Sequence, residues 1–135
     1  MDCVFCKIVK GEIPAEKLFE DDSVFVFMDI RPINPGHVLI VSKAHHETFV
    51  DTPKELACIM LAAAQKTGTA LLKGLKCDGF NVGINNGAAA GQVIGHTHYH
   101  VIPRFANDGL KHWPGRDYQE GQMKVVAERI KQSLR

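Results

Sequence analysis

Residues 96–100 read His-Thr-His-Tyr-His and lie between the apolar pairs Val93-Ile94 and Val101-Ile102. In an extended strand, successive side chains point to opposite faces, so all three imidazoles would share one face. Histidine can act as a base, an acid, a nucleophile or a metal ligand near neutral pH. The segment therefore predicts chemistry on one rigid strand, while the spacing alone leaves catalysis, a transition-metal site and a polar sheet face open.

The loop before this segment favours phosphoryl chemistry. Residues 85–92 read Asn-Asn-Gly-Ala-Ala-Ala-Gly-Gln, so Asn85 and Gln92 offer amide side chains and the glycines let main-chain N–H groups approach an anion. A neighbouring imidazole can attack phosphorus and form a phosphohistidine-type intermediate, which divides one displacement into two easier ones. We therefore expect a phosphate group beside the histidines.

Length and composition narrow the class of protein. With 135 residues, 45% of them hydrophobic, the chain predicts a single domain over residues 1–135 with a core of its own. The net charge of +1 comes without a basic stripe, which argues against a nucleic-acid partner. No segment approaches the roughly 18 apolar residues of a membrane helix, and Met1-Asp2-Cys3 does not begin a signal peptide. We expect a soluble cytoplasmic protein without a membrane partner, whose four cysteines are thiols or metal ligands.

Periodicity and turn residues predict the elements that position these groups. We expect helices at 4–10, from 53 to about 73 and at 122–134, a hairpin at 19–28 with its turn at 20–22, and strands at 37–41, 80–85 and 96–102. Thr52-Pro53-Lys54-Glu55 predicts a capping box for the long helix. Locally paired strands with grouped helices indicate an α+β protein with an antiparallel sheet.

Both long helices show apolar residues at helical spacing. The long helix presents Leu56, Ile59, Met60, Ala63, Ala70 and Leu71, with Cys58 as a small core-side or flanking residue that has no catalytic role. The last helix presents Val125, Val126, Ile130 and Leu134.

Beyond these local patterns, the chain resembles a known family. Residues 91–102 are similar to the signature of the histidine triad (HIT) superfamily of nucleotide hydrolases and transferases. Further segments resemble the family pattern in the same order: Phe5–Ile8, Gly11–Pro14, Asp29-Ile30, Pro35-Gly36-His37 and His112-Trp113-Pro114. The resemblance extends to bacterial and archaeal HIT proteins and to the nucleoside phosphoramidase branch. It implies an α+β fold of five antiparallel strands and two main helices, and a homodimer in which two sheets join.

The resemblance also implies an activity, namely cleavage at the α-phosphorus of a purine nucleoside phosphoramidate or a related phosphoanhydride, with release of AMP or GMP. His98 matches the nucleophile that forms a nucleotidyl-histidine, and His100 matches the residue against the phosphate oxygens. His37 would complete the polar cluster and hold protons, and either of these two neighbours is a plausible donor to charge on the phosphoryl oxygens.

The same resemblance assigns the nucleotide contacts. Asn85 and Gln92 match positions that contact the phosphate and the leaving-group side, and Gln92 is counted among the catalytic residues. Asp29 matches the carboxylate that accepts the ribose hydroxyls. The base pocket would be lined by Phe5, Ile8, Phe27, Ile30 and Leu39. Taken singly, each of these five is equally well read as an ordinary core residue.

The chain departs from the family pattern at Val93. The family often has Ser or Thr there, so a hydroxyl donor to the phosphate or leaving group is missing. The branch within the family is also open, because His112-Trp113-Pro114 resembles the phosphoramidases, whereas Pro103-Arg104 resembles dinucleoside polyphosphate hydrolases. Two different classes of protein compete with an enzyme: a non-catalytic nucleotide-binding regulatory module, and a zinc or nickel protein that uses all three triad histidines as ligands.

The second constellation is Cys3-Val4-Phe5-Cys6. Two thiolates two residues apart are half of a tetrahedral zinc site, whose remaining ligands are commonly histidines. A thioredoxin-like redox pair would have the same spacing, but no βαβ unit surrounds the motif. Some bacterial and archaeal HIT proteins bind zinc through a similar pair and two histidines, which here would be His45, in preference to His46, and His96. We expect a structural zinc that joins the N-terminus to the triad strand.

Overall fold

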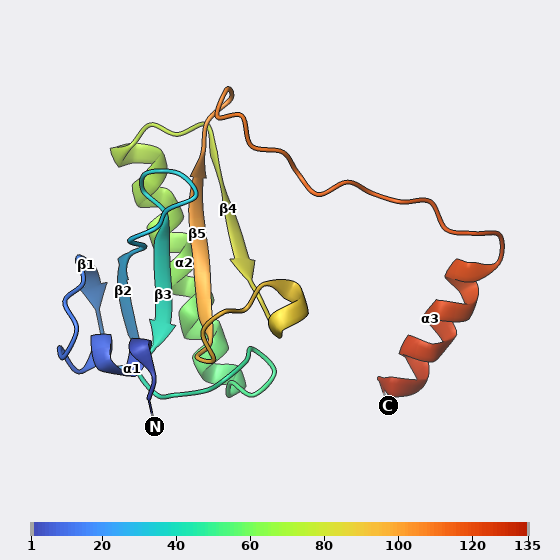
Figure 1. Ribbon diagram of the computed structural model, residues 1–135, viewed down its shortest axis with the longest axis horizontal. Helices are drawn as coiled ribbons and strands as arrows, with labels where there is room; N and C mark the ends of the chain where they lie inside the picture. Colours follow the sequence, from blue (N-terminus) through green and yellow to red (C-terminus); the bar gives the residue numbers. More distant parts are fainter. Residues whose placement is uncertain (1, 135) are drawn as a thin grey trace.

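The computed structural model describes residues 2–134 and contains a five-stranded sheet with helices on both faces (Figure 1). The strands are β1 (Lys17–Glu20), β2 (Val24–Met28), β3 (Val38–Ser42), β4 (Gly79–Ile84) and β5 (His98–Arg104). The helices are α1 (Val4–Val9), α2 (Lys54–Gly74) and α3 (Gln122–Ser133), with a 3-10 turn η1 (Ala88–Ala90). The strand order is β1-β2-β3-β5-β4, and every neighbouring pair is antiparallel. The predicted α+β class and antiparallel five-stranded sheet are confirmed.

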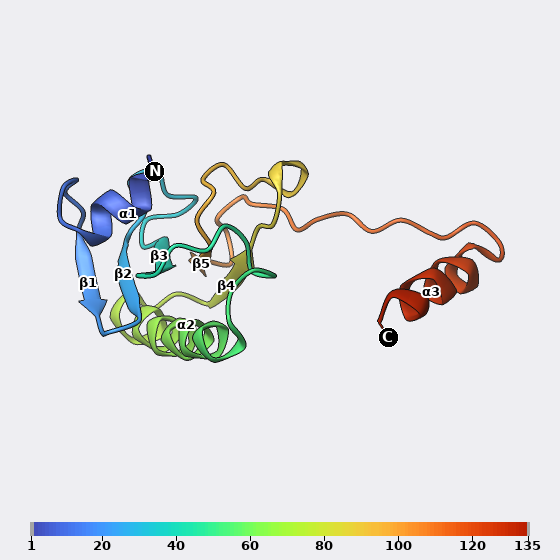
Figure 2. The ribbon, with the colours of Figure 1, turned by 90° about the horizontal axis from the view of Figure 1, so that it is seen from below.

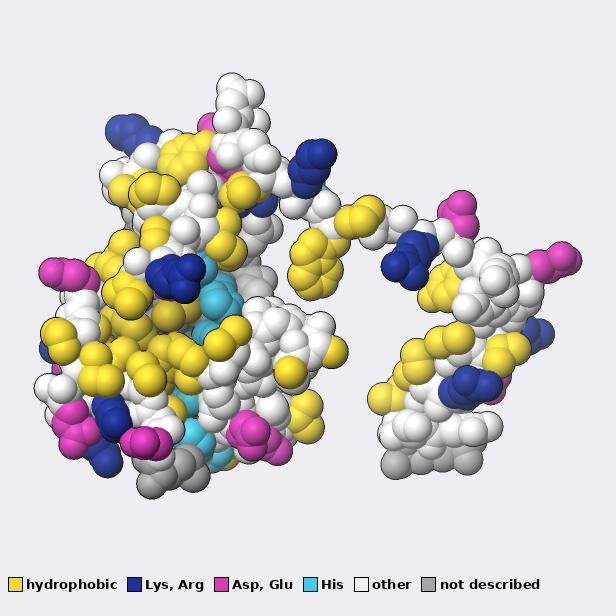
Figure 3. Space-filling model, in the orientation of Figure 1, with side chains coloured by type: hydrophobic (Ala, Val, Ile, Leu, Met, Phe, Trp, Pro, Cys, Tyr) yellow, Lys and Arg dark blue, Asp and Glu magenta, His cyan; other side chains and the backbone are white. Residues whose placement is uncertain are grey.

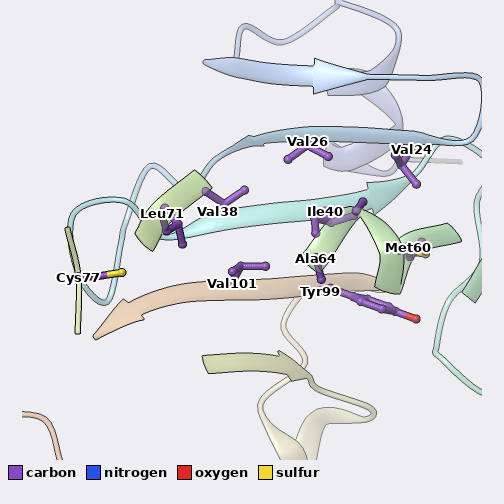
Figure 4. Close-up of a cluster of buried hydrophobic side chains, with 11 residues drawn as sticks. Val24, Val26, Val38, Ile40, Met60, Ala64, Leu71, Cys77, Tyr99 and Val101 are labelled. Carbon is purple, nitrogen blue, oxygen red and sulfur yellow. The ribbon is translucent and has the colours of Figure 1, made fainter. Parts of the chain in front are cut away.

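Figure 2 shows three layers, with α1 on one face of the sheet and α2 on the other. Alternate residues of the central strands fill the two interfaces, because side chains alternate along a strand. Val24, Val26, Val38, Ile40, Tyr99 and Val101 pack with α2 in the cluster drawn in Figure 4. Phe25, Phe27, Leu39 and Val41 pack with Phe5 and Ile8 of α1. Since Tyr99 and Val101 face α2, His98 and His100, which alternate with them along β5, face the layer of α1.

The triad strand begins two residues later than predicted. β5 starts at His98, opposite Val41 of β3, and His96 lies in the preceding turn, with its N–H bonded to the Ile94 carbonyl. The prediction that three imidazoles share one face of a strand is therefore wrong for His96. The reason is local: β3 ends at Ser42, whose carbonyl accepts a hydrogen bond from the His96 ring.

The extent of α2 is confirmed, but details of its prediction are wrong. Thr52 does not form the capping box: Pro53 occupies the N-cap, and the Thr52 hydroxyl donates to the Thr48 carbonyl at 2.8 Å. The buried line of α2 is Met60, Ala63, Ala64, Thr67, Gly68 and Leu71. Predicted apolar-face residues Ile59 and Ala70 are exposed, and so is Cys58. Since successive residues of an α-helix are about 100° apart, these three lie about 90° or more from the centre of the buried line and face outward.

The C-terminal arm, residues 109–134, leaves the sheet after β5 and ends in α3. Figures 1 and 2 both place α3 apart from the sheet. The predicted helix is confirmed, but its apolar residues Val125, Ile130 and Leu134 are exposed rather than buried. That residues 1–135 form a single domain stays a prediction. Within residues 2–134, no helix combines the length and apolarity needed to cross a membrane.

Two glycines of α2 offer a matched test of its packing. A Cβ at Gly68 would overlap the Phe80 ring, whereas a Cβ at Gly74 would meet nothing within 4 Å. We expect Gly68→Ala to lower the free energy of unfolding by about 1–3 kcal/mol, because the overlap forces Phe80 or the helix to move. Gly74→Ala should leave it unchanged or raise it by up to about 1 kcal/mol. Urea unfolding measures both, and equal stabilities for the two variants would contradict this account of the interface.

Candidate functional site

Three imidazoles meet on the α1 side of the sheet. β5 supplies His98 and His100, whose ring centroids are 4.9 Å apart, and His37 enters from the start of β3. His37 Nε2 lies 2.9 Å from His100 Nδ1. His37 and His98 are buried, and Figure 3 shows histidine side chains beside an apolar region on this face.

The proton of His98 is located by a main-chain group. His98 Nδ1 lies 2.7 Å from the carbonyl oxygen of His96, and a carbonyl can only accept, so Nδ1 carries the proton. Burial lowers the pKa of His98 and keeps the ring neutral. Phe5 packs edge-on against the ring, with the centroids 4.9 Å apart. His98 Nε2 is therefore left with a free lone pair, which is the form that a nucleophile requires.

A second chain of hydrogen bonds fixes His37 and His100. The Ile33 N–H donates to His37 Nδ1 at 3.1 Å, so His37 carries its proton on Nε2. That proton is donated to His100 Nδ1, which leaves the His100 proton on Nε2. Within residues 2–134, this buried Nε2 has no hydrogen-bond partner. Burial, with smaller effects of His98 and His37, lowers the pKa of His100 to about 4, so it is a neutral donor.

An unpartnered buried donor costs free energy until an acceptor reaches it. His100 lines a cleft of 510 Å³, together with Asn85, which follows β4. A phosphoryl oxygen is an acceptor of the right kind, because it carries charge and several lone pairs. The cluster can thus present a lone pair from His98 and an N–H group from His100 to one phosphorus centre.

The group Asp29, His37 and His100 also brings three possible metal ligands within 4.8 Å of one another. The hydrogen bonds speak against a metal there. A metal on His37 Nε2 would move the ring proton to Nδ1, where it would face the Ile33 N–H, another donor. Asp29 Oδ1 meanwhile accepts the Arg31 N–H at 2.8 Å, and its other oxygen lies 3.6 Å from His37 Nε2. We call the His37–His100 hydrogen bond, which Asp29 approaches, the histidine relay.

Gln92 and Asn85, the two loop residues predicted to contact phosphate, have different surroundings. Gln92 closes its own loop: its Nε2 donates to the Glu47 carbonyl at 2.7 Å, and its Oε1 accepts the Gly87 N–H at 2.9 Å. Asn85 lines the cleft beside His100. Val93, the departure from the family pattern, is 93% exposed.

Four of the five predicted base-pocket residues lie together. Phe5, Ile8, Phe27 and Leu39 are buried in one cluster between α1 and the sheet. Ile30 is 90% exposed on the loop that follows β2, so it does not share their environment. The buried four form the core under α1, and Phe5 of this apolar wall contacts His98.

Cys3, Cys6, His45 and His96 converge on the other side of His98. Each offers one ligand atom, and these four atoms lie within 4.8 Å of one another. His96 Nε2 lies 2.7 Å from the Ser42 carbonyl and so carries the proton, which leaves a lone pair on Nδ1. That Nδ1 lies 3.4 Å from Cys3 Sγ, 3.6 Å from Cys6 Sγ and 3.1 Å from His45 Nδ1. His46, the neighbour in the doublet, is not among the four.

These separations suit a tetrahedral ion. With Zn–N near 2.0–2.1 Å and Zn–S near 2.3 Å, tetrahedral ligands lie about 3.3 Å apart for two nitrogens and about 3.6 Å for nitrogen and sulfur. The Cys6 Sγ to His45 Nδ1 distance is 3.3 Å. The donor set, the tautomer of His96 and the spacing therefore fit zinc, and the Ser42 carbonyl orients the ring from behind.

The cleft beside His100 has its outer wall on the C-terminal arm. Lys111, His112 and Trp113 line it opposite β4 and β5. Trp113 is 91% exposed, so its ring is not packed against the rest of the chain.

Sequence reasoning missed the groups that locate the protons. The carbonyl groups of Ser42 and His96 and the N–H of Ile33 are main-chain groups, which carry no residue-type signal. Asn34 and Asp108 were also missed, although Asn34 lies in the Pro- and Asn-containing loop that the sequence marks before His37.

Comparisons with known proteins agree with this geometry. A family model described as the HIT domain matches residues 10–107. An uncharacterised HIT-like protein of Methanocaldococcus jannaschii is 47% identical over 107 residues, which cover 79% of this chain and 82% of that protein. Adenylylsulfatase HINT3 of Arabidopsis thaliana is 42% identical over 127 residues, covering 94% of this chain and 64% of that protein. Adenosine 5′-monophosphoramidase HNT1 of Candida albicans is 37% identical over 142 residues, covering 98% and 91%.

Solved structures add the same fold at similar identity. A HIT family protein from Bacillus subtilis superposes with a TM-score of 0.88 at 34% identity, covering 98% of this chain and 96% of that one. A zinc-bound histidine triad family protein from Mycobacterium smegmatis gives 0.79 at 37% identity, covering 98% of each chain. With a matching family model, well-covered relatives and the triad geometry in place, the chain belongs to the HIT domain family.

Proposed function

We propose that the protein is a nucleotide hydrolase that cleaves at the α-phosphorus of a purine nucleoside phosphoramidate or a related phosphoanhydride. It releases a nucleoside monophosphate, and AMP is the product that we expect first. The observation that carries the proposal is the pair formed by the free lone pair on His98 Nε2 and the unpartnered N–H of His100. Relatives named adenylylsulfatase and adenosine 5′-monophosphoramidase support an adenylate substrate.

The reaction then has two displacements at one phosphorus. His98 Nε2 attacks the α-phosphorus, the bond to the leaving group breaks, and an adenylyl-histidine forms. The His100 N–H donates to a phosphoryl oxygen as charge develops there. Water next attacks the same phosphorus, the P–N bond to His98 breaks, and AMP leaves. The leaving group takes a proton from solvent as it departs in the first displacement. The proton that water releases in the second displacement returns to solvent, so the cycle consumes one water molecule and His98 returns to its neutral form.

The remaining contacts follow the family pattern. Asp29 accepts the ribose hydroxyls, and the apolar wall around Phe5 and Phe27 contacts the base. Asn85 faces the phosphate from the loop, and Gln92 acts by holding that loop closed on the site. The base occupies the base pocket, and the leaving group extends past His100 into the cleft.

A second candidate is hydrolysis of dinucleoside polyphosphates. Lys111 lines the cleft beyond His100, and this cation favours a leaving group with further phosphates, whereas the charge of Arg104 is paired with Asp108. In this case the chemistry at His98 is unchanged and only the leaving group differs. A nucleotide-binding module without turnover is the outcome in which AMP binds but no substrate is cleaved.

Replacement of His98 tests the nucleophile. We expect the wild type to release AMP from adenosine 5′-phosphoramidate, and His98→Asn to lose at least about a thousandfold in kcat, because an amide has no basic nitrogen to attack phosphorus. AMP release is followed by chromatography, and AMP affinity by calorimetry shows that the variant still binds nucleotide.

The result has three informative outcomes. Equal turnover by wild type and variant would rule out attack by His98. An inactive wild type that binds AMP would move the search to diadenosine polyphosphates as substrates. Failure on those substrates as well would leave the binding module as the function.

We further propose that Cys3, Cys6, His45 and His96 hold a structural zinc ion. The convergence of the four donors and the tautomer of His96 support it, and so does the zinc-bound relative. The ion would join α1 to the segment before β5 and would not contact the substrate. All four cysteines are free thiols, which suits the reducing cytoplasm that we assign to the protein.

Metal analysis tests this assignment. We expect about one zinc per chain in the wild type and in His98→Asn, and a loss of at least tenfold in zinc affinity in Cys6→Ser, because one of four ligands is gone. Cys58→Ser is the matched control, since Cys58 is an exposed cysteine on α2. Loss of zinc in His98→Asn would instead indicate that the triad itself is the ligand set.

We also propose a homodimer. β4 is an edge strand, and Val82 on it is 42% exposed. On α3 the residues Met123, Val126, Ile130 and Leu134 recur at helical spacing, although this helix lies away from its own sheet. An isolated 12-residue helix is marginal in water, so packing against a second copy would account for both features.

A matched pair on α3 tests the dimer. Ile130→Asp and Gln132→Asp each add one negative charge, but only the first falls on the apolar side. We expect Ile130→Asp to raise the dimer dissociation constant at least about tenfold through lost apolar burial, and Gln132→Asp to leave it near the wild-type value. Sedimentation measures the constant. A wild type of one subunit mass at all concentrations would reject the dimer.

A further inference from the structure

The carboxylate of Asp108 gathers the donors of three segments. Its two oxygens accept from Arg104 Nε at 2.8 Å and Nη2 at 3.2 Å, and from Asn34 Nδ2 at 3.1 Å. They also accept the main-chain N–H groups of Phe105 at 3.1 Å and Leu110 at 3.0 Å. These bonds, above all those from Arg104, hold the pKa of Asp108 well below its usual range, so the group is a carboxylate throughout the working pH range.

One branch of this network leads to the histidine relay. Asn34 Nδ2 donates to both Asp108 and the Pro103 carbonyl, which ties the loop before β3 to the end of β5. The carbonyl of Asn34 accepts the main-chain N–H of His37 at 3.0 Å. The adjacent Ile33 N–H is the group that donates to His37 Nδ1 and so places the proton of His37 on Nε2. Asp108 therefore fixes the loop that fixes the tautomer of His37.

The other branch leads to the outer wall of the cleft. Leu110 is held at both main-chain groups, since its N–H donates to Asp108 and its carbonyl accepts from Arg104 Nη2 at 3.2 Å. The next residues, Lys111 to Trp113, line the cleft opposite His100. These bonds fix the distance of the wall from β5, because the wall is otherwise carried by an exposed loop.

We propose that Asp108 is a positioning residue that joins the two halves of the site, holding the wall at residues 110–113 and the His37–His100 relay in one fixed relation. This inference rests on the proposed function. Under that function, the relay contacts the phosphoryl oxygens and the wall contacts the leaving group. Asp108 touches neither, and it sets how a bulky leaving group lies relative to the phosphorus under attack.

Asp108→Asn is the direct test, and Asp78→Asn is its control. Asparagine keeps the shape but has an NH₂ group that faces the donors of Arg104 or Asn34. The Asp78 side chain lies just before β4 and accepts the Ala106 N–H at 2.8 Å. This hydrogen bond belongs to neither branch of the Asp108 network. The variants are compared as full-length protein in the same metal-loaded state as the wild type.

The first readout does not depend on turnover. Nitrogen-15 NMR of labelled histidine distinguishes a protonated from an unprotonated ring nitrogen. We expect His37 to be protonated on Nε2 in the wild type and in Asp78→Asn, and Asp108→Asn to show the other tautomer or a mixture. A wild-type spectrum in a folded Asp108→Asn would overturn the proposal.

The second readout separates the two branches. Adenosine 5′-phosphoramidate has a small leaving group, and an N-aryl adenosine phosphoramidate has one that reaches the wall. We expect Asp108→Asn to lower kcat on both substrates by on the order of tenfold to a hundredfold, and to raise KM only for the aryl substrate, because misplacement of about 1 Å has effects of this size. Equal changes in KM for the two substrates would contradict the role at the wall.

A second variant keeps the test decisive if Asp108→Asn does not fold. Asn34→Ala removes the branch to His37 and keeps the Arg104–Asp108 ion pair, so an unchanged His37 tautomer in that variant would overturn the proposal. If the wild type cleaves neither substrate, the proposed phosphoramidase activity fails, while the NMR comparison still decides whether Asp108 positions the relay.

Discussion

The 2.7 Å hydrogen bond from His98 Nδ1 to the carbonyl oxygen of His96 connects the two centres of this molecule. On one side of that peptide, the His96 side chain belongs to the cysteine and histidine cluster. On the other side, the carbonyl places the proton of His98 and so frees its Nε2. Any shift of residue 96 would change the proton and the orientation of residue 98. The proposed nucleophile therefore depends on the position of the cysteine and histidine cluster, to which this one peptide group joins it.

The alternation of β5 makes this arrangement possible. Tyr99 and Val101 anchor the strand in the core against α2, and His98 and His100, which alternate with them, are turned toward α1. α1 in turn carries Cys3 at its N-cap, Cys6 in its first turn and Phe5, which packs against His98. One short helix thus serves the metal cluster, the apolar wall and the edge of the nucleophile. Packing of Phe5 and Ile8 against the sheet holds these six residues of helix in place.

Much of this organisation could be predicted from the sequence, because its signals are side-chain types at fixed spacing. The antiparallel sheet, the long helix and the grouping of Cys3, Cys6, His45 and His96 follow from periodicity and from resemblance to the family. The start of β5 could not be predicted, since the alternating pattern continues through His96 while the partner strand ends at Ser42. The proton positions depend on main-chain groups, and the network of Asp108 depends on a contact 74 residues apart in the chain.

Under the proposed function, burial of the histidines has a consequence for the end of the reaction cycle. His37, His98 and His100 all have lowered pKa values, mainly because they are buried, so at neutral pH they hold an anion through dipoles and carry no net positive charge. A phosphoramidate or anhydride phosphorus carries about one negative charge, whereas a monophosphate with a second pKa near 6 carries nearly two. Neutral donors give that additional charge little extra attraction, and water solvates it well. The site is thus suited to let its product go.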